Sequence, residues 1–284
     1  MRADLRTIVV FLDATPSGER RAAHAAAFAQ RWGAHLVGVH VVFAGVRLDP
    51  SMSNARGSKA IQHVFAYKQQ LDEEAEASGA RLGERFRSLC ERLGVSGEHR
   101  AIARGKSEAE AILHSLHSDL VVVGHPAHGL PDGMSPESLL LSSRMPLLIV
   151  PDAWEGDTIG DRVLIGWNAT PEARRAVSDS MSFLVAAKSV TVLVVDPARS
   201  QHHGDEPGAD IALHLARHGV QVEVVQTESG GSPIAEVILR QAARIGADLL
   251  VVGAYSHARL KQLLLGGATR TLLTRTPVPV LISR

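Results

Sequence analysis

The chain contains one sequence pattern twice, and this internal repeat constrains the fold more than any other feature. The apolar run 8–12 leads into residues 13–16, Asp-Ala-Thr-Pro, and the apolar run 163–167 leads into residues 168–171, Asn-Ala-Thr-Pro, 155 positions later. An apolar strand therefore enters a turn in both places. Each turn leads into a stretch with apolar residues at helical spacing, so the local order is strand, loop and helix.

Further matches extend the repeat along the chain. Their two copies lie 154, 129 and 133 positions apart, at residues 20–22 and 174–176, 119–124 and 248–253, and 146–150 and 279–283. The first of these matches, Arg-Arg-Ala in both copies, aligns Arg21 with Arg175. One structural unit is therefore present twice.

The apolar runs are rich in Val, Leu and Ile without polar alternation, which is typical of strands buried on both faces of a parallel sheet. In the first half we expect strands at 7–12, 35–43, 97–103, 119–124 and 146–150, and helices at 18–32, 61–93, 107–116 and 135–143. In the second half we expect strands at 162–167, 189–195, 220–226, 248–253 and 278–282, and helices at 172–186, 208–218, 232–245 and 266–275. This alternation predicts an α/β protein with two tandem, doubly wound, five-stranded parallel-sheet domains of the Rossmann-like type.

The length agrees with this division, since 284 residues are about twice the size of a typical domain. We place domain 1 at residues 1–152, a linker at 153–160 and domain 2 at 161–284. Domain 1 is longer because of an insertion at about 44–60 and a longer helix after it. The insertion lacks apolar periodicity, so we expect a mobile surface loop, with cover over a cleft as the alternative.

Composition excludes several classes of function. Lys plus Arg and Asp plus Glu both number 30, so the chain has no net charge with which to hold a nucleic acid. Aromatic residues make up 4%, too few for stacking platforms for bases. The sequence shows neither a signal peptide nor an apolar run of about 18 residues, so we expect no membrane association. Cys90 is the single cysteine, which excludes an intrachain disulfide and favours a cytoplasmic location.

The carboxyl ends of the predicted strands are the expected ligand sites. In an open parallel sheet, ligands bind beyond these ends, at the point where the strand order reverses. In this sequence the relevant positions are Asp13 and Asn168 after the first strand of each half, and the loops that follow Gly124 and Gly253.

The repeated strands and these loops resemble the universal stress protein family, in a tandem two-domain form. The resemblance rests on the strand that ends at residues 13–15, the strand that enters Gly253, the Leu-Leu-Leu-Gly segment 263–266 and the closing segment 277–282. It covers nearly the whole chain. It implies the doubly wound fold and directs attention to nucleotides as ligands.

Family members that bind ATP carry a loop with the pattern Gly, two residues, Gly, nine residues, Gly and then Ser or Thr. In domain 2, Gly253 and Gly266 match, whereas Ser256 replaces the second glycine and Gly267 replaces the hydroxyl residue. Asn168 stands where ATP-binding members have an Asp. The resemblance therefore implies a weakened site for ATP or another adenine nucleotide in domain 2, formed by Asn168, Ala169, Thr170, Gly253, Ser256, Gly266, Gly267 and Ala268.

Domain 1 departs further from the ATP-binding pattern, although it retains Asp13. Gly124 matches, Ala127 replaces the second glycine, and the third position falls on Glu137 by direct count or on Gly133 by alignment with the closing strand. A carboxylate would repel phosphate, and the other alignment shortens the loop. Three prolines also remove amide donors. We therefore expect that domain 1 does not hold ATP in the manner of the family.

Other chemistry has weak support. His125, His128 and Asp132 lie on one loop and could ligate a divalent metal. With 14 histidines in the chain, a chance pair is the simpler interpretation, so we predict no metal site. Cys90 stands among apolar helical residues, where a buried thiol is usual. The sequence has neither a Gly-x-Ser-x-Gly nor a P-loop pattern, and we predict no catalytic residue.

The resemblance also implies that subunits pair through their last strands. The strands at 146–150 and 278–282 should therefore pair within one chain and form an intramolecular pseudo-dimer. A further homodimer stays open, and the sequence identifies no protein partner. We expect a non-enzymatic, cytoplasmic stress-response protein that acts as a binding or scaffold module. The alternative is an adenine-nucleotide (ATP) switch in domain 2, and slow nucleotide hydrolysis is a third interpretation.

Overall fold

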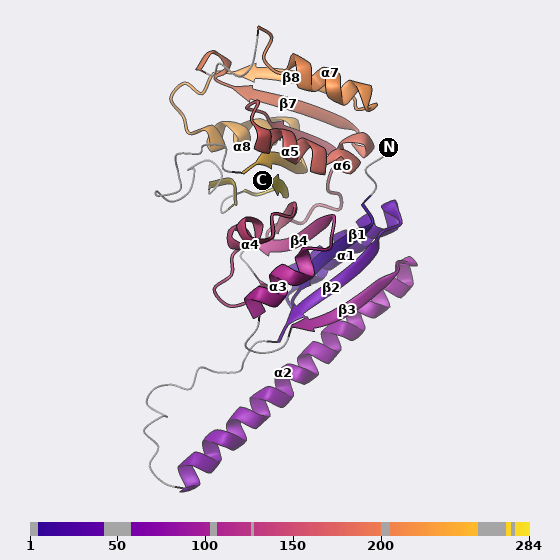
Figure 1. The fold of residues 1–284 in the computed structure, drawn as a ribbon, viewed down its shortest axis with the longest axis vertical. Coiled ribbons are helices and arrows are strands. Elements are labelled where there is room, and N and C mark those ends of the chain that lie inside the picture. The colour runs from indigo at the N-terminus through magenta and orange to yellow at the C-terminus, as the bar shows by residue number, and fades with distance from the viewer. Residues whose placement is uncertain are drawn as a thin grey trace.

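A single mixed sheet runs through the computed structural model, which describes residues 5–42, 58–102, 107–125, 128–199, 205–254, 271–273 and 276–284. Within these residues ten strands lie in the order β3-β2-β1-β4-β5-β10-β9-β6-β7-β8 (Figure 1). Their bounds are β1 Thr7–Leu12, β2 His35–Val41, β3 Gly97–Ile102, β4 Leu120–His125, β5 Leu147–Pro151, β6 Arg162–Gly166, β7 Ser189–Val195, β8 Val222–Thr227, β9 Leu249–Gly253 and β10 Val280–Ser283. We call β1 to β5 with their helices lobe 1, and β6 to β10 with theirs lobe 2.

The two lobes join through an antiparallel pair of closing strands. Leu281 of β10 lies opposite Leu148 of β5, and all other neighbouring strands in the sheet are parallel. Both leucines are fully buried. The predicted pairing of the closing strands is therefore confirmed, and two five-stranded halves form one ten-stranded sheet.

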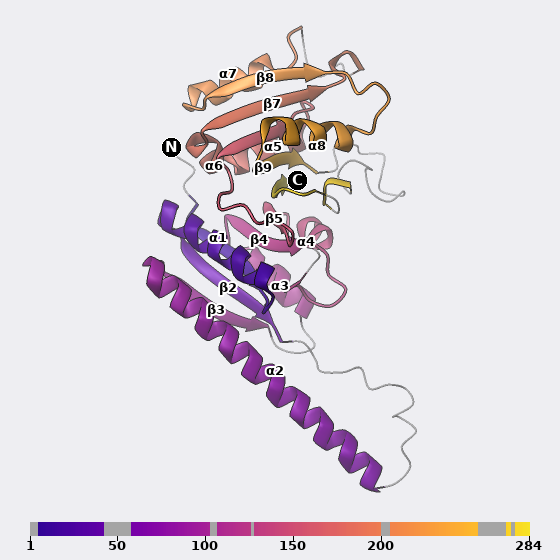
Figure 2. The same ribbon diagram turned by 180° about the vertical axis from the view of Figure 1, so that it is seen from behind.

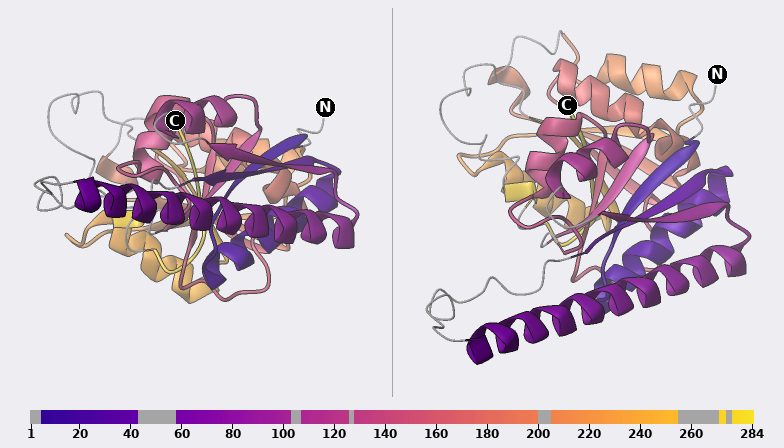
Figure 3. Two further views of the ribbon diagram at one scale, coloured as in Figure 1. Left: turned by 90° about the horizontal axis from the view of Figure 1, so that it is seen from below. Right: turned by 60° about the horizontal axis from the view of Figure 1, so that its bottom comes forward.

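Helices cover both faces of this sheet (Figures 2 and 3). Their bounds are α1 Pro16–Trp32, α2 Ser58–Leu93, α3 Ser107–Ser115, α4 Pro136–Ser143, α5 Pro171–Asp179, α6 Met181–Ala186, α7 Ala209–Arg217 and α8 Ile234–Ile245. One apolar core contains side chains of α1, α2, α5, α6 and α7, and the other contains side chains of α3, α4 and α8. Among the described helices, none combines the length and apolar character needed to cross a bilayer.

The first helix of each lobe begins with the same cap. Thr15 and Thr170 accept hydrogen bonds from the amides of Gly18 and Ala173, and a proline follows each threonine at the first helical position. The caps lie 155 positions apart, and the buried positions of α1 and α5 coincide at the same offset. The alignment of Arg21 with Arg175 was therefore wrong, because the repeated Arg-Arg-Ala segment lies one residue out of register with the helices.

Two predicted helices differ in the structure. The helix expected at 172–186 is divided at Ser180, which is fully buried and donates its hydroxyl hydrogen to the carbonyl oxygen of Val177. Such a bond competes with the backbone ladder of a helix. Of the helix expected at 266–275, the structure describes residues 271–273, which are helical.

Helix α2 packs on the sheet only through its second half. Its buried positions begin at Gly79, and between Ser58 and Ser78 none of the described side chains is buried. The first half extends away from lobe 1, as all views show (Figures 1 to 3). The expected insertion at about 44–60 overlaps the start of α2, and residues 43–57 lie outside the described part of the chain.

Aromatic contacts add a second junction between the lobes. Phe183 of α6 makes edge-to-face contacts with Phe28 and Trp32 of α1, at centroid distances of 5.1 and 4.7 Å. Arg31 also donates to the carbonyl oxygen of Ala186 at 3.1 Å. The two lobes are therefore in contact beside the sheet as well as through it.

Candidate functional site

The strand order reverses once in each lobe, between β1 and β4 and between β6 and β9. The loops after these strands diverge, which leaves polar side chains at the carboxyl ends of the strands. We call Asp13, Gly124 and the residues in contact with them the strand-end site of lobe 1. Asn168, Ala169, Thr170 and Gly253 form the strand-end site of lobe 2.

In lobe 1, the Asp13 carboxylate is held by its own turn and by an arginine. Its Oδ1 accepts a hydrogen bond from the Thr15 amide at 2.9 Å and another from the Thr15 hydroxyl. Its Oδ2 forms an ion pair with the guanidinium of Arg21. The side chain of Asp13 is 10% exposed and that of Arg21 is 1% exposed, so the pair lies inside the protein.

Arg21 makes further contacts at the point where β1 and β4 separate. Its Nε donates to the carbonyl oxygen of Phe11 at 3.3 Å, and its Nη2 lies 3.5 Å from the carbonyl oxygen of His128. The guanidinium also lies where a Cβ on Gly124 would stand, so a larger residue at this position of β4 would have to displace it. Arg21 therefore fills the space between the two strand ends.

A second carboxylate lies on the far side of Arg21. Oδ1 of Asp152, the residue after β5, is 3.7 Å from Nη1 of Arg21. Within the described residues, neither of these buried atoms has a hydrogen-bond partner. Asp152 also accepts a hydrogen bond from Arg20 through its carbonyl oxygen at 2.9 Å, and its Oδ2 lies 3.4 Å from Nε2 of His128. The start of the interlobe segment is therefore attached to the lobe 1 site.

The lobe 2 site has an amide where lobe 1 has the Asp13 carboxylate. Asn168 is exposed, and its Oδ1 accepts a hydrogen bond from the Thr170 hydroxyl at 2.9 Å. Ala169 has φ of 55°, a left-handed conformation that alanine seldom adopts. Ala176 takes the place that Arg21 holds in lobe 1, since the two helices correspond at an offset of 155. An amide and a methyl group thus stand where lobe 1 has an ion pair.

Gly253 allows a helix to approach β9 closely. A Cβ at this position would overlap the backbone of Glu172 and Ala173 in the first turn of α5. The equivalent Gly124 faces the Arg21 guanidinium instead. The same glycine therefore serves different packing in the two lobes. The other residues predicted for the lobe 2 site lie outside the described part of the chain, namely Ser256, Gly266, Gly267 and Ala268.

The histidine loop of lobe 1 does not assemble a metal site among the residues that the structure describes. His128 is directed to Asp152, and Asp132 is exposed. No group of three described His, Cys, Asp or Glu side chains is placed to hold a metal ion. Cys90 is buried, and burial raises the pKa of its thiol.

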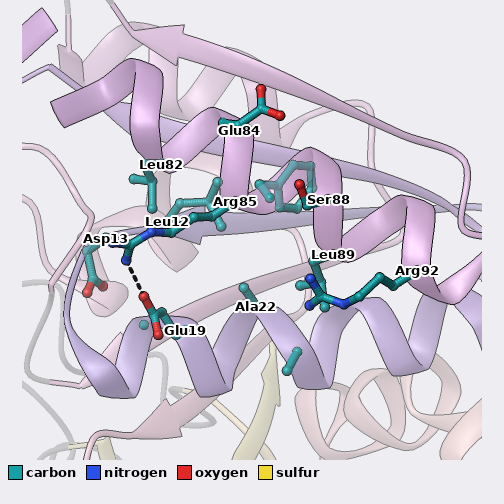
Figure 4. Close-up of a pocket in the computed structure, with 13 residues that line it drawn as sticks. Leu12, Asp13, Glu19, Ala22, Leu82, Glu84, Arg85, Ser88, Leu89 and Arg92 are labelled. Atoms are coloured by element: carbon teal, nitrogen blue, oxygen red, sulfur yellow. Dashed lines mark hydrogen bonds and ion pairs between the residues drawn. The ribbon is translucent and has the colours of Figure 1, made fainter. Parts of the chain in front are cut away.

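A groove of about 780 Å³ runs between α1 and α2, starting at Asp13 (Figure 4). Ala22, Leu82 and Leu89 line it, and an ion pair between Arg85 of α2 and Glu19 of α1 spans it. These two charged side chains are more than half exposed. The groove holds both signs of charge and so indicates no particular ligand.

Sequence reasoning did not identify Arg21 as part of the site. The buried positions at the start of α1 are Gly18, Arg21, Ala22 and Ala25, so a charged residue stands on the apolar face of an amphipathic helix. An arginine on the apolar face of a helix could have indicated a buried ion pair, because an arginine is rarely fully buried unless it is paired. The role of Asp152 had no such signal.

The single sheet of two doubly wound halves, with a strand-end site in each, defines a tandem Rossmann-like α/β protein. A model of the universal stress protein family matches the chain twice, at residues 4–151 and 161–284. The chain belongs to the universal stress protein family, in its tandem form.

The chain is also similar to individual proteins. A universal stress protein of Synechocystis sp. is 25% identical over 158 residues, which are 54% of this chain and about half, 51%, of that protein's length. A solved universal stress protein of Archaeoglobus fulgidus superposes with a TM-score of 0.67 at 17% identity, covering 99% of this chain and 96% of that one. A solved structure of a functionally unknown protein of Pseudomonas aeruginosa superposes with a TM-score of 0.55 at 18% identity, covering 98% of this chain and 92% of that one.

Proposed function

We propose that the protein is a non-enzymatic, cytoplasmic stress-response protein that acts as a binding or scaffold module. The observation that supports this proposal is that the two strand-end sites on the sheet differ from each other. In lobe 1 the Asp13 carboxylate is used in an internal ion pair, and in lobe 2 the Asn168 amide is exposed. Pairing of β5 with β10 joins the two lobes in one sheet, which therefore carries two unlike strand-end sites. We assign the lobes to domains at 1–152 and 161–284, with 153–160 as the linker.

An adenine nucleotide bound to lobe 2 is the second candidate function. The exposed Asn168 amide and the Thr170 turn support it, because an amide can both donate to and accept from ribose hydroxyls. Gly253, Ser256, Gly266, Gly267 and Ala268 complete the proposed site by the family pattern. Lobe 2 would then act as a nucleotide switch, with ATP as the first ligand to test. Slow hydrolysis of that nucleotide is a third and weaker candidate.

Calorimetry with purified protein distinguishes the first two candidates. ATP, ADP and AMP are titrated with and without Mg²⁺, into the wild type and into Gly266→Glu. Micromolar binding, about −8 kcal/mol, that is lost in the variant would establish the switch. Leu213→Glu, at an exposed position of α7, controls for an added charge elsewhere in lobe 2.

The opposite result supports the scaffold. No heat at millimolar nucleotide would mean that the substitutions at Asn168, Ser256 and Gly267 have disabled the site, and that the search should turn to protein partners. Phosphate release from ATP by the wild type, abolished by Gly266→Glu, would overturn the non-enzymatic assignment.

A further inference from the structure

We propose that Arg21 is the residue that decides which lobe can take a nucleotide: it occupies the strand-end site of lobe 1 and so confines the ligand to lobe 2. This inference rests on the proposed nucleotide function of lobe 2. It concerns a side chain that stands outside the glycine loop pattern, on the inner face of α1. Four features of lobe 1 and its comparison with lobe 2 support it.

The first feature is the use of the Asp13 carboxylate. A carboxylate offers about four acceptor positions, and three are taken by the Thr15 amide, the Thr15 hydroxyl and the Arg21 guanidinium. The Asp13 side chain is only 10% exposed. Ribose hydroxyls would have to compete with these partners for the carboxylate.

The second feature is the place of the guanidinium. Arg21 is fully buried, contacts the carbonyl oxygen of Phe11 near the end of β1 and covers the α-carbon of Gly124 on β4. These are the two strands between which the order reverses. Arg21 thus occupies the location where an open parallel sheet binds its ligands.

The third feature is that Arg21 is held from two sides. Asp13 lies on one side, and Asp152 places its Oδ1 at 3.7 Å on the other. Moving the guanidinium out would leave the buried Asp13 charge without compensation, which is strongly unfavourable. A nucleotide therefore competes with an internal cation that is already bound.

The fourth feature is the difference from lobe 2 at the same positions. In lobe 1 the guanidinium is held by its ion pairs, by the hydrogen bonds of Nε and Nη2 and by the fit against Gly124. Lobe 2 has Ala176 at the position of Arg21 and Asn168 at that of Asp13. Neither carries charge, and the methyl group of Ala176 cannot reach across the strand ends.

The test exchanges these pairs between the lobes. Asp13→Asn/Arg21→Ala gives lobe 1 the neutral pair of lobe 2, and Asn168→Asp/Ala176→Arg gives lobe 2 the charged pair. The probes are ATP in calorimetry and 8-azido-ATP in photolabelling, with peptide mapping to identify the labelled lobe. Circular dichroism and thermal melting verify that each variant is folded. Arg21→Ala alone is also measured, since it keeps the Asp13 carboxylate but leaves it unpaired.

We expect the wild type to be labelled in lobe 2 only, with one ATP per chain. Asp13→Asn/Arg21→Ala should gain a second site that is labelled in lobe 1, and Asn168→Asp/Ala176→Arg should lose at least tenfold in affinity at lobe 2. Arg87→Ala removes an exposed arginine of lobe 1 that pairs with Glu84 on the same helix, and it should leave the stoichiometry at one.

Two results would overturn the inference. One is labelling of lobe 1 in the wild type, and the other is a folded Asp13→Asn/Arg21→Ala protein with no new site. If the wild type binds no ATP at all, the proposed nucleotide function of lobe 2 has failed. The gain of a lobe 1 site in the double variant, from none to one, would still support the role of Arg21.

Discussion

The imidazole rings of His40 and His99 stack on each other beneath α2, with centroids 5.2 Å apart and planes inclined by 16°. They come from the neighbouring strands β2 and β3. Gly79 and Gly83 of α2 make room for them, since a Cβ at these positions would lie 2.5 Å from Nε2 of His40 and 2.7 Å from Nδ1 of His99. Among the described residues, His40 Nδ1 and His99 Nε2 have no hydrogen-bond partner.

This pair should make the protein sensitive to acid. Burial lowers the pKa of both rings, and Arg87 lowers that of His99 further. Below the ordinary value of 6.5, the unfolded chain therefore binds more protons at these two positions than the folded one. The free energy of unfolding should fall as the pH decreases from above 6.5 to 5, which urea unfolding at several pH values measures.

Comparison of variants with the wild type measures how much of the pH dependence of stability comes from this pair. His40→Gln should reduce the loss of stability between pH 7.5 and 5.5, whereas His117→Gln, at an exposed position, should not. The comparison is needed because burial also lowers the pKa of other histidines, namely His24, His114 and His214. An equal slope in wild type and His40→Gln would contradict the prediction.

Gly79→Ala should destabilise the protein, against the usual rule for helices. In a helix interior alanine is favoured over glycine by about 1 kcal/mol. Here the new methyl group would lie 2.5 Å from the His40 ring, and overpacking of this kind costs about 1 to 3 kcal/mol. Chemical unfolding should show a net loss in the free energy of unfolding. In a protein that already carries His40→Ala, the same Gly79→Ala change should cost less stability, because the ring that it would contact is gone. Ala77→Gly, exposed on the same helix, measures the propensity term.

Ala169→Gly should stabilise the protein by about 1 kcal/mol. Ala169 has φ of 55°, where a Cβ is unfavourable and glycine is not. Ala14 is the equivalent residue of lobe 1 and is not among the described residues with positive φ, so Ala14→Gly should give no gain. Thermal unfolding of the two variants checks this, and equal melting temperatures would show that the turn of lobe 2 carries no strain.

The Asp248 carboxylate holds the backbone at the start of lobe 2. Replacing it should reduce stability more than replacing Asp119, its counterpart in lobe 1. Its carboxylate accepts hydrogen bonds from the amides of three successive residues, Gly160, Asp161 and Arg162, at 2.9 to 3.1 Å. Asp119 accepts two such bonds through one oxygen. We expect Asp248→Ala to lower the free energy of unfolding by at least about 2 kcal/mol, because one buried and two partly buried amides lose their acceptor.

Comparison of Asp248→Ala with Asp119→Ala tests whether the aspartate that accepts more amide hydrogen bonds contributes more to stability. Urea unfolding of both variants should show the larger loss for Asp248→Ala. A larger loss for Asp119→Ala would mean that the number of amides held does not determine the contribution of this repeated aspartate.

Much of the fold could be read from local patterns. Unbroken apolar runs identify strands buried on both faces, and the repeat at fixed offsets shows that one doubly wound unit occurs twice. The pairing of 146–150 with 278–282 followed from the family resemblance, and Leu148 opposite Leu281 confirms it. The register of the first helices did not follow, because the repeated Arg-Arg-Ala segment suggested an offset that the threonine caps contradict.

The residues at the strand ends could be predicted from the sequence, but their contacts could not. Sequence indicated Asp13 and Asn168 at the strand ends, and the structure places both there. It could not show that one is neutralised by Arg21 and the other exposed, because that difference depends on distances between β1, β4 and the segment after β5. His40 and His99 were equally hidden, since their contacts join two strands and a helix far apart in the chain.

The sequence by itself determined the class of fold, the duplication and the chemistry available at the strand ends, because periodicity and turn residues act over a few neighbouring positions. Only the tertiary structure decided which of those groups are in use. A guanidinium such as that of Arg21 is either solvated or buried beside a carboxylate, and the choice follows from packing. The same amino acid at Arg175 is exposed and pairs with Asp179 one helical turn away.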